Sequence, residues 1–223
     1  MVKSAIMKFF IDSADVNAIR DLQKCFPVSG VTTNPSILAK EGKNFKKVLC
    51  ELGALLGGKF SIHVQAVSDS AEEILKQAKE YKKTMGDNFY VKIPITEQGL
   101  RAVALCKGAG IKSTVTAVFT PTQALLAATS GADYVAPYVD RLDAMNCNGP
   151  EIVKQIVDIL KIHNMKTEVL AASFKNLRQI CEVALAGAHA ITVSPEMFKK
   201  LLFHPYTEKS IKDFEADWKS ISG

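Results

Sequence analysis

The sequence lacks the features that mark several classes of protein. Its five cysteines among 223 residues are an odd number, widely spaced, with no CxxC pair. They are typical of reduced thiols in a cytosolic protein and argue against a disulfide framework or a zinc site. No apolar run approaches the roughly 20 residues that span a bilayer. The N-terminal apolar stretch is short and interrupted by lysines, unlike a secretory signal. We expect a cytoplasmic protein without a membrane segment.

The sequence also lacks a large net charge and a cluster of histidines. The net charge is +5, and no basic run is interleaved with aromatic residues, so we expect no nucleic-acid partner. The mild positive charge is compatible with anionic small molecules, although ordinary surface composition explains it equally well. The four histidines, His63, His163, His189 and His204, show no ligand spacing. We expect neither a metal nor another cofactor.

Short β-branched runs alternate with helical patterns along the whole chain. The runs that predict strands are Lys8–Ile11, Gly30–Thr33, Phe60–Gln65, Phe89–Ile93, Ser113–Val118, Tyr134–Tyr138, Glu168–Ala172 and Ala190–Val193. Amphipathic stretches predict helices over Ala14–Cys25, Pro35–Ala39, Ala71–Met85, Gln98–Lys107, Thr122–Thr129, Glu151–Ile162 and Leu177–Ala186. Successive strands are separated by about 20 to 33 residues, the length of a βα unit.

Eight such units without a break in composition predict one (β/α)₈ barrel, with residues 1–223 as a single domain. An additional C-terminal helix, Glu208–Ser220, places Ile211, Phe214 and Trp218 on one stripe. It packs either on its own barrel or on a neighbouring chain. A doubly wound open sheet is the alternative fold, but it normally carries a Gly-rich phosphate turn after its first strand. The sequence has no GxGxxG motif.

Lys92 is the most informative single residue, because it lies inside the apolar run Phe89–Pro94. Burial disfavours an ammonium ion, lowers its pKa and leaves a neutral amine able to attack a carbonyl. The alternative is a strand lysine whose stem packs while its amine reaches solvent.

Chemistry in a barrel of this kind occurs at the carboxyl ends of the strands. Nearly every predicted strand carries one polar residue at or near that end, which favours the catalytic interpretation of Lys92. These residues are Asp12, Thr32, Thr33, Asn34, Gln65, Lys92, Thr116, Tyr138 with Arg141 beyond it, and Ser173.

The same segments carry a family resemblance. Ile11–Asp15, Gly30–Ser36, Val91–Pro94, Thr116–Phe119, Ala136–Arg141 and Ala171–Lys175 follow in order along the chain. Together they resemble the small transaldolase and fructose-6-phosphate aldolase family, over essentially the whole length.

The resemblance implies a role for each matching residue. Lys92 would form a Schiff base with a ketose phosphate, and Asp12 would handle protons on the sugar hydroxyls. Thr32 and Asn34 would orient the dihydroxyacetone hydroxyls. The phosphate would be held by Arg141, Ser173 and, with weaker support from the motif, Lys175. The resemblance also implies a homo-oligomer, a pentamer or decamer.

Each residue also has a simpler structural interpretation. Asp12 could cap the following helix, and residues 32–34 could form a turn and cap before Pro35. Arg141 could pair with a nearby aspartate at the rim. Tyr138 could pack in the core with its hydroxyl satisfied, and Ser173 could cap the next helix.

Two residues bear on whether the enzyme is an aldolase or a transaldolase. In transaldolases of this family the third-strand residue is typically glutamate and the sixth-strand aromatic is typically phenylalanine, whereas this chain has Gln65 and Tyr138. An aldolase must protonate the enamine and release free dihydroxyacetone. Tyr138, with Gln65 and Thr116 holding a water molecule, could supply that proton. We therefore expect an aldolase, with transaldolase as the alternative.

Other interpretations remain open. His63 lies on the same strand face as Gln65, and a buried, hydrogen-bonded histidine is favoured there over a proton-transfer role. Lys92 could act without covalent chemistry in a sugar-phosphate isomerase or decarboxylase. The chain could also be a catalytically silent sugar-phosphate-binding barrel.

Overall fold

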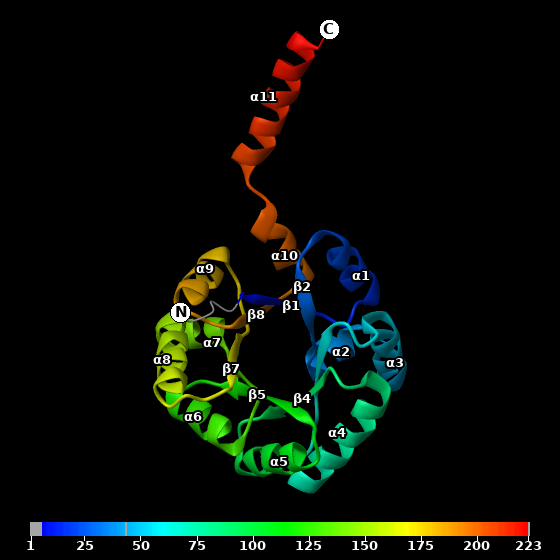
Figure 1. Cartoon of the computed structure of the whole chain (residues 1–223), viewed down its shortest axis with the longest axis vertical. Helices are drawn as coiled ribbons and strands as arrows, with labels where there is room; N and C mark the ends of the chain where they lie inside the picture. Colours follow the sequence, from blue (N-terminus) through cyan, green and yellow to red (C-terminus); the bar gives the residue numbers. More distant parts are fainter. Residues whose placement is uncertain (1–5, 43, 223) are drawn as a thin grey trace.

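The structure, a computed structural model, describes residues 6–42 and 44–222, and its centre is a closed barrel of parallel strands (Figure 1). The strands pair in chain order and β8 closes the barrel against β1. Their bounds are β1 Lys8–Asp12, β2 Val28–Thr32, β3 Ser61–Gln65, β4 Phe89–Pro94, β5 Lys112–Val118, β6 Tyr134–Pro137, β7 Glu168–Ala171 and β8 Ala190–Val193. The predicted (β/α)₈ barrel is confirmed.

Helices surround the strands in a ring, as Figure 1 shows. Their bounds are α1 Val16–Cys25, α2 Pro35–Lys40, α3 Phe45–Leu56, α4 Ala71–Met85, α5 Glu97–Gly108, α6 Pro121–Ser130, α7 Val139–Ala144, α8 Gly149–Ile162, α9 Leu177–Leu185, α10 Pro195–Leu202 and α11 Pro205–Ile221. Most begin at a side-chain cap, because the first helical N–H groups need acceptors. In α6 the cap Thr120 and Gln123 satisfy each other's backbone N–H groups.

The strands are apolar because both of their faces are buried. Residues facing outward, such as Val31, Val64 and Val91, are 0% exposed and pack beneath the helices. Inward-facing residues alternate with them, so Lys8, Phe10 and Asp12 of β1 all point into the barrel. Along its axis the interior has an aromatic floor toward the amino ends of the strands and a polar mouth at their carboxyl ends.

Gly30 shapes the floor of the barrel. A Cβ atom at Gly30 would collide with the backbone carbonyl of Ser61 and the ring of Phe10. The absence of a side chain on β2 therefore lets the Phe10 ring lie across the interior, where its edge contacts His63 and Tyr134.

The eight predicted strands agree with the observed ones to within two residues at each end. The predicted helices are present, whereas α3, α7 and α10 were not predicted. The signal for α3 was available: Val48, Leu49, Leu52 and Leu56 lie at helical spacing and are all buried.

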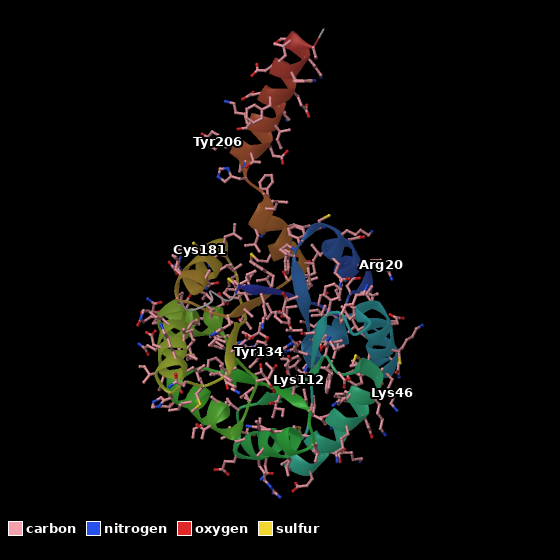
Figure 2. The ribbon with its side chains drawn as sticks, viewed as in Figure 1. Arg20, Lys46, Lys112, Tyr134, Cys181 and Tyr206 are labelled. Atoms are coloured by element: carbon pink, nitrogen blue, oxygen red, sulfur yellow. The ribbon has the colours of Figure 1, made fainter. Side chains whose placement is uncertain are left out.

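Helix α11 extends away from the barrel as an isolated rod (Figure 1). It contains no buried residue, and Tyr206 projects from it well clear of the barrel (Figure 2). The possibility that it packs on its own barrel is therefore wrong for this structure. None of the helices in residues 6–42 and 44–222 combines the length and apolarity needed to cross a membrane.

Candidate active site

The Lys92 side chain is buried inside the barrel near its mouth, with only 6% of the residue exposed. Its Nζ donates a hydrogen bond of 2.8 Å to the backbone carbonyl of Thr33, which follows β2. No carboxylate forms an ion pair with Lys92 among the described residues. Burial lowers the pKa of Lys92, and the charge of Asp12 opposes this shift only in part. These surroundings favour a reactive amine, and the solvent-reaching alternative is wrong.

Asp12 ends β1 and is held by a chain of hydroxyl groups. Thr32 Oγ1 donates to Asp12 Oδ1 at 2.7 Å and lies 2.6 Å from Thr192 Oγ1. The register of β1 and β2 pairs Asp12 with Thr32, which explains the contact. The interpretation of Asp12 as a helix cap is wrong, because Asp15 caps α1 by accepting from two backbone N–H groups.

Thr192 was missed by the sequence analysis, although the signal was present. It is a single polar residue within the apolar strand β8, and it is 4% exposed. The rule that identified polar residues on the other strands applies equally here.

Asn34 lies beside this group and caps α2. Its Oδ1 accepts a hydrogen bond from the Ile37 N–H at 3.0 Å, and Pro35 occupies the first helical position. The turn-and-cap interpretation is therefore confirmed. It does not conflict with substrate binding, because the amide NH₂ is a separate donor.

Thr116 and Tyr138 form a hydroxyl pair on the other side of the mouth, with 2.9 Å between their oxygens. A register shift in β5 at Ala117, whose φ of 58° is left-handed, follows Thr116 directly. Such bulges redirect side chains and recur beside active sites. Tyr138 is half-buried with its hydroxyl bonded.

Arg141 lies on α7, with its guanidinium carbon 4.9 Å from the centre of the Tyr138 ring. The alternative interpretation, a rim salt bridge, is wrong: within the described part of the chain Arg141 makes no ion pair. Asp140 and Asp143 instead accept hydrogen bonds from Gln179. The guanidinium group is exposed and free to meet an anion.

Ser173 and Lys175 follow β7 on the same side as α7. Ser173 has a left-handed φ of 64°, and its carbonyl accepts from the Asp140 N–H at 2.8 Å. It does not cap α9, which begins at the cap Asn176. Lys175 is exposed. No side-chain contact joins either residue to Arg141 over the ranges that the structure describes.

Gln65 lies opposite Lys92 in the register of β3 and β4 and is half-buried. Within residues 6–42 and 44–222 its side chain makes no hydrogen bond to Thr116 or Tyr138. The structure thus joins Thr116 and Tyr138 by a direct hydrogen bond, and the sharing of a water molecule with Gln65 stays a prediction.

His63 is the buried, hydrogen-bonded histidine that the sequence favoured. Its Nδ1 lies 2.7 Å from Thr114 Oγ1, and its ring stacks on Tyr90 with centroids 4.4 Å apart. Burial, followed by the charges of Lys92, Lys8 and Lys112, holds the pKa of His63 well below its ordinary value of 6.5.

Two surface hollows lie away from these residues. Surface hollows of about 450 Å³ between α8 and α9 and about 620 Å³ between α1 and α3 contain none of the residues predicted for catalysis or substrate binding. No group of three or more histidine, cysteine, aspartate or glutamate side chains able to hold a metal occurs among the described residues.

Comparison with known proteins decides the family. Residues 9–223 match the family model described as Transaldolase/Fructose-6-phosphate aldolase. The chain belongs to this family.

Individual relatives agree over nearly full length. A probable transaldolase of Alkaliphilus metalliredigens is 44% identical over 96% of this chain and 99% of that protein. A probable transaldolase of Lachnoclostridium phytofermentans is 42% identical over 97% of this chain and 100% of that protein. This transaldolase/aldolase family member is therefore an enzyme of the aldolase or transferase type.

A solved structure supports the fold separately. "Native KDPGal structure" superposes with a TM-score of 0.59 at 15% identity, over 84% of this chain and 82% of that one. At this identity the likeness extends to the barrel and not to the chemistry.

Proposed function

We propose that the chain is a class I aldolase in which Lys92 forms a Schiff base with fructose 6-phosphate. The reaction cleaves or forms the C3–C4 bond and connects the ketose with dihydroxyacetone and glyceraldehyde 3-phosphate. One observation carries the proposal: a buried lysine near the mouth of a barrel donates a hydrogen bond to the Thr33 carbonyl and has no side-chain partner among the described residues. Burial lowers the pKa of this amine, so that a neutral nucleophile is available.

The proposed cleavage of fructose 6-phosphate proceeds through an imine and an enamine. The amine attacks C2 of the ketose, and the carbinolamine loses water to give a protonated imine. Loss of the C4 hydroxyl proton then breaks the C3–C4 bond, and the electron pair flows into the imine to form an enamine. Protonation at C3 regenerates the imine, and hydrolysis consumes one water molecule and releases dihydroxyacetone.

Asp12 is the proposed acid and base for these proton transfers. Thr32 donates to its Oδ1, which leaves the other carboxylate oxygen available to a sugar hydroxyl. Thr32 and Asn34 are the proposed orienting groups for the dihydroxyacetone hydroxyls, because both lie at the end of β2 beside Asp12.

Arg141, Ser173 and Lys175 are the proposed phosphate site. Arg141 supplies a planar fork of donors that suits phosphate, and the Asp140–Ser173 backbone bond ties its helix to the end of β7. Lys175 would add charge from the exposed loop beyond.

The hydroxyl pair Thr116–Tyr138 supports aldolase over transaldolase activity. A phenol bonded to a second hydroxyl can deliver a proton to the enamine and recover it from solvent. Gln65, opposite Lys92, would help hold the water molecule. Transaldolase activity is the second candidate, and the relatives named probable transaldolase support it.

Product analysis separates the candidates. The purified enzyme is incubated with fructose 6-phosphate, with and without erythrose 4-phosphate. Free dihydroxyacetone without the acceptor supports the aldolase, whereas sedoheptulose 7-phosphate formed only with the acceptor supports the transaldolase. A sugar-phosphate isomerase or a silent binding barrel would form neither product, and borohydride would trap no adduct on Lys92.

We also propose that the enzyme is a cytoplasmic homo-oligomer, a pentamer or decamer, in which α11 packs on a neighbouring copy. Ile211, Phe214 and Trp218 form an apolar stripe on α11 and are 47%, 69% and 67% exposed. A stripe of this kind on a projecting helix is costly in water. The unpaired cysteines fit the reducing cytoplasm. Light scattering of the Trp218→Ser protein tests the assembly, with a smaller particle expected than for the parent.

A further inference from the structure

His63 lies in the barrel interior just beneath Lys92. The register of β3 and β4 pairs His63 with Tyr90 and Gln65 with Lys92. Because barrel strands are tilted, inward-facing side chains of neighbouring strands lie at alternating heights along the barrel axis. Lys92 therefore lies at a height between His63 and Gln65. His63 is 0% exposed, whereas Gln65 is half-buried.

The His63 ring is locked in place. It is stacked on Tyr90 with an interplanar angle of 11°, and the rings of Phe10 and Tyr134 approach it edge-on at 5.0 and 5.3 Å. Nδ1 is bonded to Thr114 Oγ1. The remaining nitrogen, Nε2, is buried and has no hydrogen-bond partner among the described residues. A buried polar atom without a partner is destabilising, and a packed carbon atom at this position would avoid that destabilisation.

The charges around the ring favour one protonation state. The groups that face it are three lysines and two neutral phenols: Lys92, Lys8, Lys112, Tyr90 and Tyr134. Burial and these cations hold the pKa of His63 low, so the imidazole is neutral. The neighbouring cations also favour the neutral tautomer whose lone pair is on Nε2, in which Nδ1–H donates to Thr114 Oγ1 and Nε2 is an acceptor.

A nucleophilic amine needs two acceptors and one free lone pair. The Thr33 carbonyl takes one N–H of Lys92. If a second N–H is held from below, the lone pair points to the mouth, where the ketone arrives. Asp12 is on the mouth side and is engaged by Thr32.

We propose that His63 is a positioning residue for Lys92, whose Nε2 accepts the second N–H of the neutral amine, directly or through one water molecule. This inference rests on the proposed Schiff-base function. No bond is made or broken at His63 and no proton is transferred to it, so its effect is on the orientation of the amine.

Three variants test the proposal. His63→Leu removes the acceptor, His63→Gln keeps a neutral hydrogen-bonding group, and Tyr134→Phe is the matched control in the same aromatic cluster. We expect His63→Leu to lower kcat for fructose 6-phosphate cleavage by between about 10-fold and 100-fold with little change in KM. His63→Gln should recover most of that loss, and Tyr134→Phe should leave kcat unchanged.

A fourth variant, His63→Glu, adds a carboxylate beneath the amine. It stabilises the ammonium form and should raise the pH of half-maximal borohydride trapping on Lys92 by about one unit. Circular dichroism establishes which variants fold, and the comparison of His63→Leu with His63→Gln decides the matter if His63→Glu does not. Equal kcat in folded His63→Leu and His63→Gln would overturn the inference. Absence of any Lys92 adduct in the parent protein would instead overturn the proposed function.

Discussion

Two inward-facing lysines lie at opposite ends of the same barrel, and their surroundings differ. Lys8, at the start of β1, donates to Glu168 at 2.6 Å and to the Tyr134 hydroxyl at 3.0 Å, and its side chain is 39% exposed. Lys92, near the end of β4, is 6% exposed and donates to the Thr33 backbone carbonyl. Among the residues that the structure describes, Lys8 thus has a counterion and access to water, whereas Lys92 has no counterion and is buried.

The two lysines therefore have different roles: Lys8 contributes to stability, and Lys92 is available for chemistry. An ion pair with Glu168 gives Lys8 a counterion and ties β1 to β7 across the closing strands of the barrel. Lys112 at the same end has an aromatic partner in place of a counterion, with its amine 5.0 Å from the centre of the Tyr90 ring; Figure 2 shows Lys112 and Tyr134 within the ring of strands. Both lysines of the floor thus have side-chain partners, whereas Lys92 near the mouth has none among the described residues.

Exchanging each lysine for methionine tests the contrast most strongly. We expect Lys92→Met to lower fructose 6-phosphate cleavage by at least about a thousandfold without unfolding the protein, because the nucleophile is lost while its volume is kept. Lys8→Met should retain the parent rate but lose about 1 kcal/mol of unfolding free energy. Steady-state kinetics and urea titration measure the two effects. A loss of activity in both variants would remove the distinction.

The Tyr138→Phe variant tests the proton donor at the mouth. Removal of the phenol should slow release of dihydroxyacetone by about 100-fold or more, within the range of general acid catalysis. Transfer to erythrose 4-phosphate should suffer less, because that route needs no protonation of the enamine. The measurement is the ratio of the two products. An unchanged ratio would show that another group supplies the proton.

The Asp12→Asn variant tests the one charge that opposes desolvation of Lys92. The Asp12 carboxylate raises the pKa of Lys92, so its removal should lower that pKa further and extend the neutral amine to lower pH. The pH of half-maximal borohydride trapping should fall by up to about one unit, even as kcat falls. A shift to higher pH would contradict this electrostatic picture.

Acid stability tests the neutral histidine. The pKa of His63 is held well below 6.5 in the folded state. Below about pH 6.5 the histidine therefore binds a proton in the unfolded chain but stays neutral in the folded protein. As pH falls below about 6.5, the unfolding free energy should decrease, by on the order of 1 kcal/mol for each pH unit. His63→Gln should show a flatter dependence between pH 6.5 and about pH 5 in urea titrations. An identical pH dependence of the unfolding free energy in both proteins would show that another group causes the loss of stability at low pH.

The fold was predictable because the strands of a closed parallel barrel are buried on both faces and therefore stand out as short β-branched runs. The single polar residue near each strand end was equally visible, and Asp12, Thr32, Lys92, Thr116 and Tyr138 lie at or near the carboxyl ends of their strands. Helix α7 was harder to foresee, since Val139–Ala144 has only six residues and no side-chain cap.

The contacts within the site were less predictable than its members. The Thr33 carbonyl that receives Lys92 is a backbone group, which residue identity does not reveal. The pairing of His63 with Thr114 depends on barrel tilt, because the two lie on strands that are not adjacent. The position of Gln65 opposite Lys92 depends on the register of β3 and β4, which residue identity does not reveal.

Mapping the covalent adduct tests the central claim most directly. The parent protein is treated with borohydride in the presence of fructose 6-phosphate or dihydroxyacetone, digested and analysed by mass spectrometry. We expect one stoichiometric adduct on the peptide that contains Lys92, and none on the peptides that contain Lys8 or Lys112. Turnover of fructose 6-phosphate with no adduct on Lys92 would contradict the account.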